Sequence, residues 1–171
     1  VPPLQNASIT EEPELRKMYG KLLSGDMNKQ KKSSVHPAYV EIINQMSSDD
    51  AKLFRRIAEI NNSIPVASVR FVFGTSYLTN IMPHYFSPFF TGWDPWKVSM
   101  CIENLSRLTV FHFFEGTVNN YDYEEIKQEA FVTERFEFAK KNNPSRELSI
   151  KITSYVIQMN DFGRGLARLC F

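Results

Sequence analysis

The stretch SSVHPAYVEIINQMSSDDAKLFRRI, residues Ser33–Ile57, decides how the first part of the chain folds. Pro37 stands where the first turn of a helix tolerates proline. The apolar residues that follow recur at helical spacing: Tyr39, Ile42, Ile43 and Met46. Ser47 ends this helix and caps the next one, with Asp50 three residues further on as in a capping box. The stretch therefore predicts two consecutive helices, and Phe54 and Ile57 lie on the buried face of the second.

The same stretch holds a histidine, several acids and two arginines, so a catalytic site is the alternative interpretation. His36 directly precedes Pro37 at the start of a helix, where its ring can act as a local hydrogen-bond partner. A catalytic or metal-binding role needs partner residues at a suitable spacing, which the sequence does not supply. We therefore interpret His36 as structural.

Upstream, the pattern of apolar residues predicts a helix from Thr10 to Met27, capped by Thr10 and followed by the basic connector NKQKKSS. Downstream, alternation predicts a strand near residues 66–73. Residues 76–82 are compatible with a short helix, and Asp94 with Pro95 starts a longer one. Further on we expect a strand at 109–114, a helix at 121–143, a strand at 149–158 with a bulge or bend near Ser154, and a last helix from Asp161.

The order of these elements predicts a mainly helical α+β protein. We expect an N-terminal helical segment, residues 1–45, and then a winged-helix-like part with a small antiparallel sheet, residues 46–171, with an insertion near 119–143. Within it, Asn104, Leu105 and Arg107 match the amide–Leu–x–Arg–Leu pattern that closes the third helix of such domains. The two parts together are expected to form one compact unit.

Bulk composition excludes several classes of function. The 171 residues carry a net charge of +1, so no strong overall field favours nucleic acid or an anionic membrane. No apolar run reaches the roughly 20 residues that span a bilayer. Cys101 and Cys170 form no CxxC pair, and we favour buried free thiols over a disulfide. The chain begins without Met, and we expect it to be a fragment of a cytoplasmic protein.

Candidate catalytic groups have simpler interpretations. The acids of residues 124–137 alternate with Lys and Arg, which is typical of a solvated helix face. His84 and His112 are far apart and lack a metal-binding motif. Gly163 does not belong to a phosphate-binding loop and more simply allows close packing. We therefore predict no enzyme site, no metal and no cofactor.

Aromatic residues between 77 and 96 are the least ordinary local feature of the sequence. Two interpretations stay open: they close a small core beneath a long loop, or they form a ligand groove or partner surface. The residues concerned are Tyr85, Phe86, Phe89, Phe90 and Trp93. A partner could be another protein or a second copy of the chain.

A winged helix can also bind DNA, so a transcriptional regulator is the alternative function. Lys97 and Arg107 are the basic residues expected on the exposed face of the helix that starts at Asp94. Two cations are few for neutralising phosphates. Whether nucleic acid is bound therefore stays open.

Four segments taken in order resemble the bacterial Abi-alpha family, whose name refers to abortive infection, a defence against phage. They are PELRKMYGKLLSGDMN, VHPAYVEIINQMSSDDAKLF, IENLSRL and FGRGLARLC. The motif residues His36, Pro37, Asn104, Leu105, Arg107 and Gly163 all fall in these segments. The resemblance implies antiviral defence but no catalytic residues, so we expect a non-enzymatic interaction module.

Overall fold

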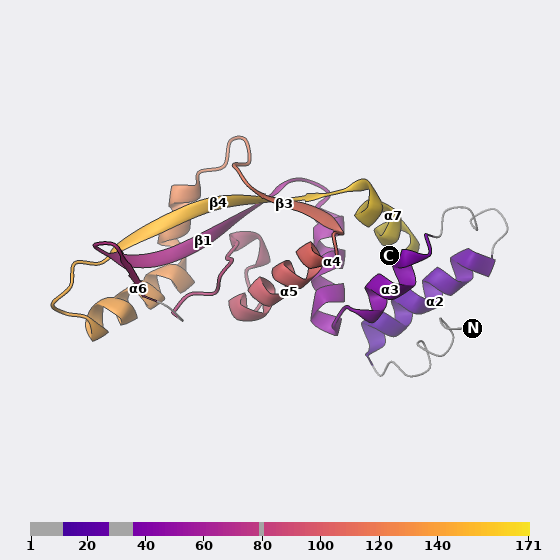
Figure 1. The fold of residues 1–171 in the computed structure, drawn as a ribbon, viewed down its shortest axis with the longest axis horizontal. Coiled ribbons are helices and arrows are strands. Elements are labelled where there is room, and N and C mark those ends of the chain that lie inside the picture. The colour runs from indigo at the N-terminus through magenta and orange to yellow at the C-terminus, as the bar shows by residue number, and fades with distance from the viewer. Residues whose placement is uncertain (1–11, 28–35, 79–80) are drawn as a thin grey trace. The chain divides into compact units, whose positions relative to one another are not determined.

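The structure is a computed structural model that describes residues 12–27, 36–78 and 81–171. Their contacts group them into two compact units (Figure 1). Unit 1 comprises the described residues up to Asn62 together with Cys101–His112 and Met159–Phe171. Unit 2 comprises the described residues of Ser63–Met100 and Phe113–Gln158. Each unit thus joins stretches that are distant in sequence.

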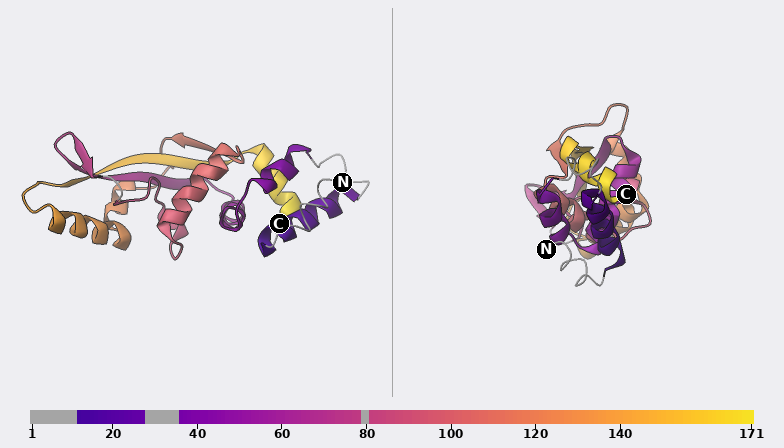
Figure 2. Two further views of the ribbon diagram at one scale, coloured as in Figure 1. Left: turned by 60° about the horizontal axis from the view of Figure 1, so that its bottom comes forward. Right: turned by 90° about the vertical axis from the view of Figure 1, so that its right-hand side faces the viewer.

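Unit 1 is built from helices. They are α2 (Pro13–Met27), α3 (Ala38–Asn44), α4 (Ser48–Ile60), the second half of α5 (Pro95–Arg107) and α7 (Asp161–Cys170). Helix α2 packs against α3, α4 and α7, and Figure 2 shows α2 and α7 side by side. The predicted helix ending at Met27 is confirmed from Pro13 onward, and its predicted cap Thr10 lies outside the described residues.

The capping box predicted for α4 is confirmed. The Ser47 hydroxyl accepts from the backbone N–H of Asp50 at 3.1 Å, and the Asp50 carboxylate accepts from the backbone N–H of Ser47 at 2.8 Å. This pairing satisfies two N–H groups that a helix start leaves without intrahelical partners. At the other end, Asn61 adopts the left-handed conformation (φ 47°) that commonly terminates helices.

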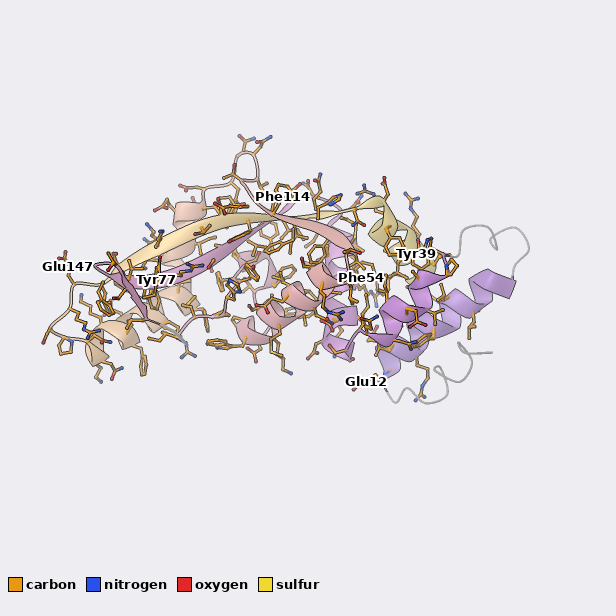
Figure 3. All side chains as sticks on the ribbon, in the orientation of Figure 1. Glu12, Tyr39, Phe54, Tyr77, Phe114 and Glu147 are labelled. Atoms are coloured by element: carbon orange, nitrogen blue, oxygen red, sulfur yellow. The ribbon has the colours of Figure 1, made fainter. Side chains whose placement is uncertain are left out.

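The core of unit 1 is apolar and tightly closed. Tyr19, Phe54 and Leu105 are fully buried, and Figure 3 shows the Tyr39 and Phe54 side chains among the helices. Cys101 and Cys170 are both buried and form no disulfide with each other, as the sequence predicts. Burial raises the pKa of the Cys170 thiol to about 12, although the Lys21 charge lowers it. Cys170 is therefore a neutral thiol at physiological pH.

Unit 2 contains most of a four-stranded sheet of order β2-β1-β4-β3. The strands are β1 (Ile64–Phe73), β2 (Ser76–Leu78), β3 (Phe111–Glu115) and β4 (Ser149–Met159). β1 and β4 lie side by side and antiparallel, with Val66 opposite Tyr155 and Phe71 opposite Ile150 (Figure 1). The predicted strands and the pairing of the first with the last are confirmed.

One local prediction was wrong, and one alternative of another is excluded. Residues 76–78 form β2 rather than the start of a short helix, because Gly74 (φ 57°) lets the chain fold back so that β2 pairs with the end of β1. The register of β1 and β4 runs through Ser154 without interruption, so the ladder contains no bulge there. The alternation of β4 changes because Val156 and Ile157 are both buried, one on each face of the strand.

The predicted helix of residues 121–143 is divided. A 3₁₀ helix, η3 (Tyr123–Gln128), precedes α6 (Ala130–Asn142), and Glu129 between them is extended (ψ 134°). Tyr123 and Ile126 are both buried three residues apart, which matches the period of a 3₁₀ helix. Because of this break, Glu129 occupies the N-cap position of α6 rather than a position inside one continuous helix.

Overall, the protein has the mainly helical α+β fold that the sequence predicts. The start of α5 at Asp94 and Pro95 is also confirmed, since the Asp94 carboxylate accepts from the backbone N–H of Trp96 at 2.9 Å. The winged-helix likeness and the division at residue 45 stay predictions.

Candidate functional site

The aromatic loop, which we define as residues 81–93, is anchored to β1 in unit 2. Phe86 and Ala67 exchange both backbone hydrogen bonds, each at 2.8 Å. The Ser87 hydroxyl donates to the carbonyl of Pro65 at 2.7 Å. A short 3₁₀ helix, η2 (Pro88–Phe90), follows. These bonds fix the path of a segment that has little regular secondary structure.

Beyond this anchor lies a pocket of about 280 Å³, formed entirely within unit 2. The loop, the start of α5 and the start of α6 line it. The lining residues are Phe86, Ser87, Phe90, Thr91, Gly92, Trp93, Pro95, Val98, Glu129, Ala130 and Phe131. Most of them are apolar, and four are aromatic.

The pocket has a buried base and a more exposed margin. Phe86, Phe90 and Val98 are 7%, 3% and 3% exposed, whereas Trp93 and Phe131 are half-buried. The rings of Phe86 and Phe131 stack nearly parallel, with centroids 5.9 Å apart. A ligand would therefore meet aromatic surface on more than one side.

The two hydroxyl groups of the pocket are occupied by local hydrogen bonds. Ser87 donates to Pro65 and accepts from the backbone N–H of Phe89 at 3.3 Å. Thr91 donates to the carbonyl of Pro88 at 2.5 Å. Neither hydroxyl is paired with a base that would make it a nucleophile, as nucleophilic catalysis requires.

Glu129 is the charged residue of the pocket lining. It occupies the N-cap position of α6, but its side chain makes no capping hydrogen bond. Within the described part of the chain, its carboxylate has neither a hydrogen bond nor an ion pair. The charge pattern of residues 124–137 predicts a solvated helix face for Glu129, and it does not predict the pocket because the break between η3 and α6 has no signal in that pattern.

Acidic groups also gather near Glu129, around Tyr121. The pKa of Tyr121 is raised to about 12, first by burial and then by neighbouring groups, in the order Glu129, Tyr123, Glu125 and Asp122. The Tyr121 ring in turn contacts the loop at Phe89, with centroids 6.1 Å apart. Acidic side chains thus surround Tyr121, next to the loop.

The five aromatic residues singled out from the sequence do not all have the same role: some close a core beneath the loop, and others present surface. Phe86 and Phe90 are core residues, and Tyr85 packs edge-on against Phe113 and Tyr155. Phe89 stays 42% exposed, and Trp93 lines the pocket. The loop therefore closes a core and also presents aromatic surface.

The motif residues of α5 form a polar network inside unit 1. The Asn104 amide donates to the buried Asp50 carboxylate at 2.8 Å and to the Gln45 carbonyl at 3.1 Å. Its oxygen accepts from Arg107, which also donates to the Gln45 side chain at 2.8 Å. All hydrogen-bonding positions of Asn104 are thereby used.

The remaining motif residues also have local structural contacts. The His36 ring accepts from the backbone N–H of Ala38 at 3.1 Å, next to Pro37 at the N-cap of α3, and it packs against Phe162. A Cβ on Gly163 would lie 1.8 Å from the carbonyl oxygen of Val110. Leu105 is fully buried.

The basic residues considered for DNA binding belong to different units and make different contacts. Lys97 is exposed in unit 2, and the Arg107 guanidinium belongs to the Asn104 network of unit 1. Arg146 lies over the Phe73 ring at 4.1 Å, and Arg164 pairs with Asp161 at 2.9 Å. Among the described residues we find no basic cluster that favours the DNA-binding alternative.

The described residues also bear on metal binding and on membrane insertion. No three His, Cys, Asp or Glu side chains in residues 12–27, 36–78 and 81–171 gather closely enough to bind a metal ion. No helix in those ranges combines the length and hydropathy that crossing a membrane requires.

The sequence profile of the family described as "Abortive infection alpha" matches residues 1–170. The chain therefore belongs to the abortive infection alpha family. No curated protein sequence matches it significantly.

One solved structure, described as that of the uncharacterized protein from the hydrocarbon-degrading marine bacterium Alcanivorax borkumensis SK2, is similar over 84% of this chain and 97% of that one. The identity is 13% and the TM-score 0.42.

Proposed function

We propose that the chain is a non-enzymatic interaction module of a bacterial protein that acts in abortive-infection defence against phage, inside the cell. The pocket beside the aromatic loop of unit 2 is the surface that receives the partner. The observation that carries this proposal is the pocket itself: a fixed loop that leaves aromatic surface around a cavity of about 280 Å³.

Binding rather than catalysis is favoured by the chemistry of the lining. Most lining residues are apolar, and Ser87 and Thr91 use their hydroxyl groups to hold the loop in place. Aromatic side chains in concave sites contribute much of the energy of protein–protein recognition. The exposed ring of Phe89 extends that surface beyond the pocket.

The defence role is supported by membership of a family named for abortive infection. The motif residues that characterise the family resemblance lie in internal contacts of unit 1, such as the Asn104 network. They therefore support a scaffold function, and they leave unit 2 as the better candidate for partner recognition.

A phage challenge of the host tests the proposal. The gene that encodes this chain is expressed in its bacterial host, beside an empty vector, and efficiency of plating is measured for a broad phage panel. We expect protection against at least one phage. If the gene gives no protection while its deletion changes transcription of neighbouring genes, the defence role is wrong and the DNA-binding regulator takes its place.

A further inference from the structure

We propose that the pocket of unit 2 binds a lysine or arginine side chain of the partner polypeptide. This inference rests on the proposed function, because it names the group that the interaction module recognises. Three features carry it: the size of the pocket, its aromatic walls and the carboxylate of Glu129.

The pocket has room for one long side chain. Its volume is about 280 Å³. Sites for small molecules and cofactors usually occupy about 300–1,000 Å³, so this pocket falls just below that range. A single long side chain that enters from a partner would fit within it.

The walls of the pocket favour a cation. Phe86, Phe90, Trp93 and Phe131 present aromatic rings, whose faces attract Lys and Arg side chains. The Phe131 ring already makes such a contact, since the guanidinium carbon of Arg135 lies 5.3 Å from its centroid. Long aliphatic stems of Lys or Arg would also cover the apolar base formed by Val98 and Phe90.

The charge of the pocket has the complementary sign. Glu129 is the charged residue of the lining, and its carboxylate has no hydrogen bond or ion pair with any residue that the structure describes. A partner cation would therefore supply the charge-assisted hydrogen bonds that this carboxylate lacks. The cluster of carboxylates around Tyr121 adds to the attraction.

The start of α6 at Ala130 also lies in the lining, and a helix N-terminus by itself favours an anion. Here the N-cap residue is Glu129, whose negative charge opposes an incoming anion. The cation is therefore the better match.

Titration followed by NMR tests the assignment on the 171-residue chain. The probes are N-acetyl-arginine amide, N-acetyl-lysine amide and the uncharged isostere N-acetyl-norleucine amide. The indole N–H resonance of Trp93 reports on the pocket, and that of Trp96, which does not line it, is the internal control. We expect saturable shifts of Trp93 with the two cations, with dissociation constants of about 1 mM, and binding of norleucine weaker by about tenfold.

Paired variants separate charge from shape. Glu129→Gln should weaken both cationic probes by about tenfold and leave the norleucine amide unchanged. Glu137→Gln, at an exposed position of α6 outside the pocket, removes the same charge and should change nothing. Unshifted resonances elsewhere in each variant's spectrum confirm that the fold is retained.

Several outcomes would overturn the inference. They are equal binding of all three amides, indifference to Glu129→Gln, or shifts of Trp93 with inorganic phosphate. Tetramethylammonium binding at least about tenfold tighter than either cationic amide would assign the pocket to a small organic cation instead. None of these outcomes affects phage protection, which tests the proposed function separately.

Discussion

The two units use their polar and aromatic residues in opposite ways. In unit 1 the motif residues make contacts within the unit: Asn104 makes hydrogen bonds with Asp50, Gln45 and Arg107, and Gly163 allows the carbonyl of Val110 to approach. Unit 2 leaves part of its aromatic loop around an open pocket, whose lining residue Glu129 pairs with none of the described residues through its carboxylate. The difference supports the proposal that the motif residues serve as a scaffold, while recognition is a role of unit 2.

The largest effect on stability should come from Gly163→Ala in unit 1. The new Cβ would lie 1.8 Å from the Val110 carbonyl oxygen, a backbone atom that cannot move without shifting the chain. We expect a loss of about 3 kcal/mol in the free energy of unfolding, measured by urea denaturation.

Gly20→Ala is the matched control, because Gly20 also lies in a helix and a Cβ there would meet nothing within 4 Å. It should stabilise the protein by about 0.5–1 kcal/mol. Equal effects of the two substitutions would show that the close approach at Gly163 is unimportant.

Asn104→Ala should have the next largest effect. It removes the donors to Gln45 and the buried Asp50 and one of the two side-chain oxygens to which Arg107 donates. Because two of these hydrogen bonds involve charged groups, we expect a loss of about 2 kcal/mol in the free energy of unfolding. Asn142→Ala, which removes an exposed amide that bonds only within α6, should change the free energy of unfolding by less than about 0.5 kcal/mol. A neutral Asn104→Ala would contradict the scaffold interpretation of the motif.

High pH should weaken unit 1 through Cys170. Its pKa is raised from 9.0 to about 12, so the folded state keeps the thiol proton that the unfolded state loses. The stabilisation is therefore fully present below pH 9 and is lost as pH rises toward 12. By pH 10, about 1.4 kcal/mol of this stabilisation has been lost.

Urea denaturation at several pH values checks this, with Cys170→Ala as the comparison. The variant should lose less stability than wild type between pH 8 and pH 10. Parallel losses in the two proteins would mean that Cys170 is as accessible in the folded state as in the unfolded chain.

The smallest effect on stability is expected for Phe89→Ser in the aromatic loop. The ring is 42% exposed and contacts Tyr121 only at its edge, so we expect a change of less than about 0.5 kcal/mol in the free energy of unfolding. The same substitution should reduce phage protection by the encoded protein if the loop meets a partner. A large loss of stability would place Phe89 in the core and remove it from the proposed surface.

Local rules predicted much of the fold because the governing interactions are close in sequence. The capping box of Ser47 and Asp50, the Asp94 cap and the alternation of β1 are all short-range patterns. The hairpin after Gly74 was missed because its turn depends on one positive φ, and the pattern of residues 76–82 also suits a helix.

The candidate site was only partly predictable. The aromatic loop was recognised from composition, but the division of its residues between core and margin depends on the Phe86–Ala67 bridge, which joins positions 19 residues apart. Glu129 was not predicted as a pocket residue for a different reason. Its place in the pocket follows from its own extended backbone between η3 and α6, and neither periodicity nor charge pattern predicts such a break.

The most direct test of the account compares two substitutions in the protein encoded by the gene, with efficiency of plating as the readout. Ala130→Phe adds a ring at an exposed position of the pocket lining and should block it. Asn142→Phe adds the same ring at an exposed position of α6 outside the pocket. We predict that Ala130→Phe abolishes protection at wild-type stability and that Asn142→Phe retains it. Full protection by Ala130→Phe would contradict the claim that the pocket receives the partner.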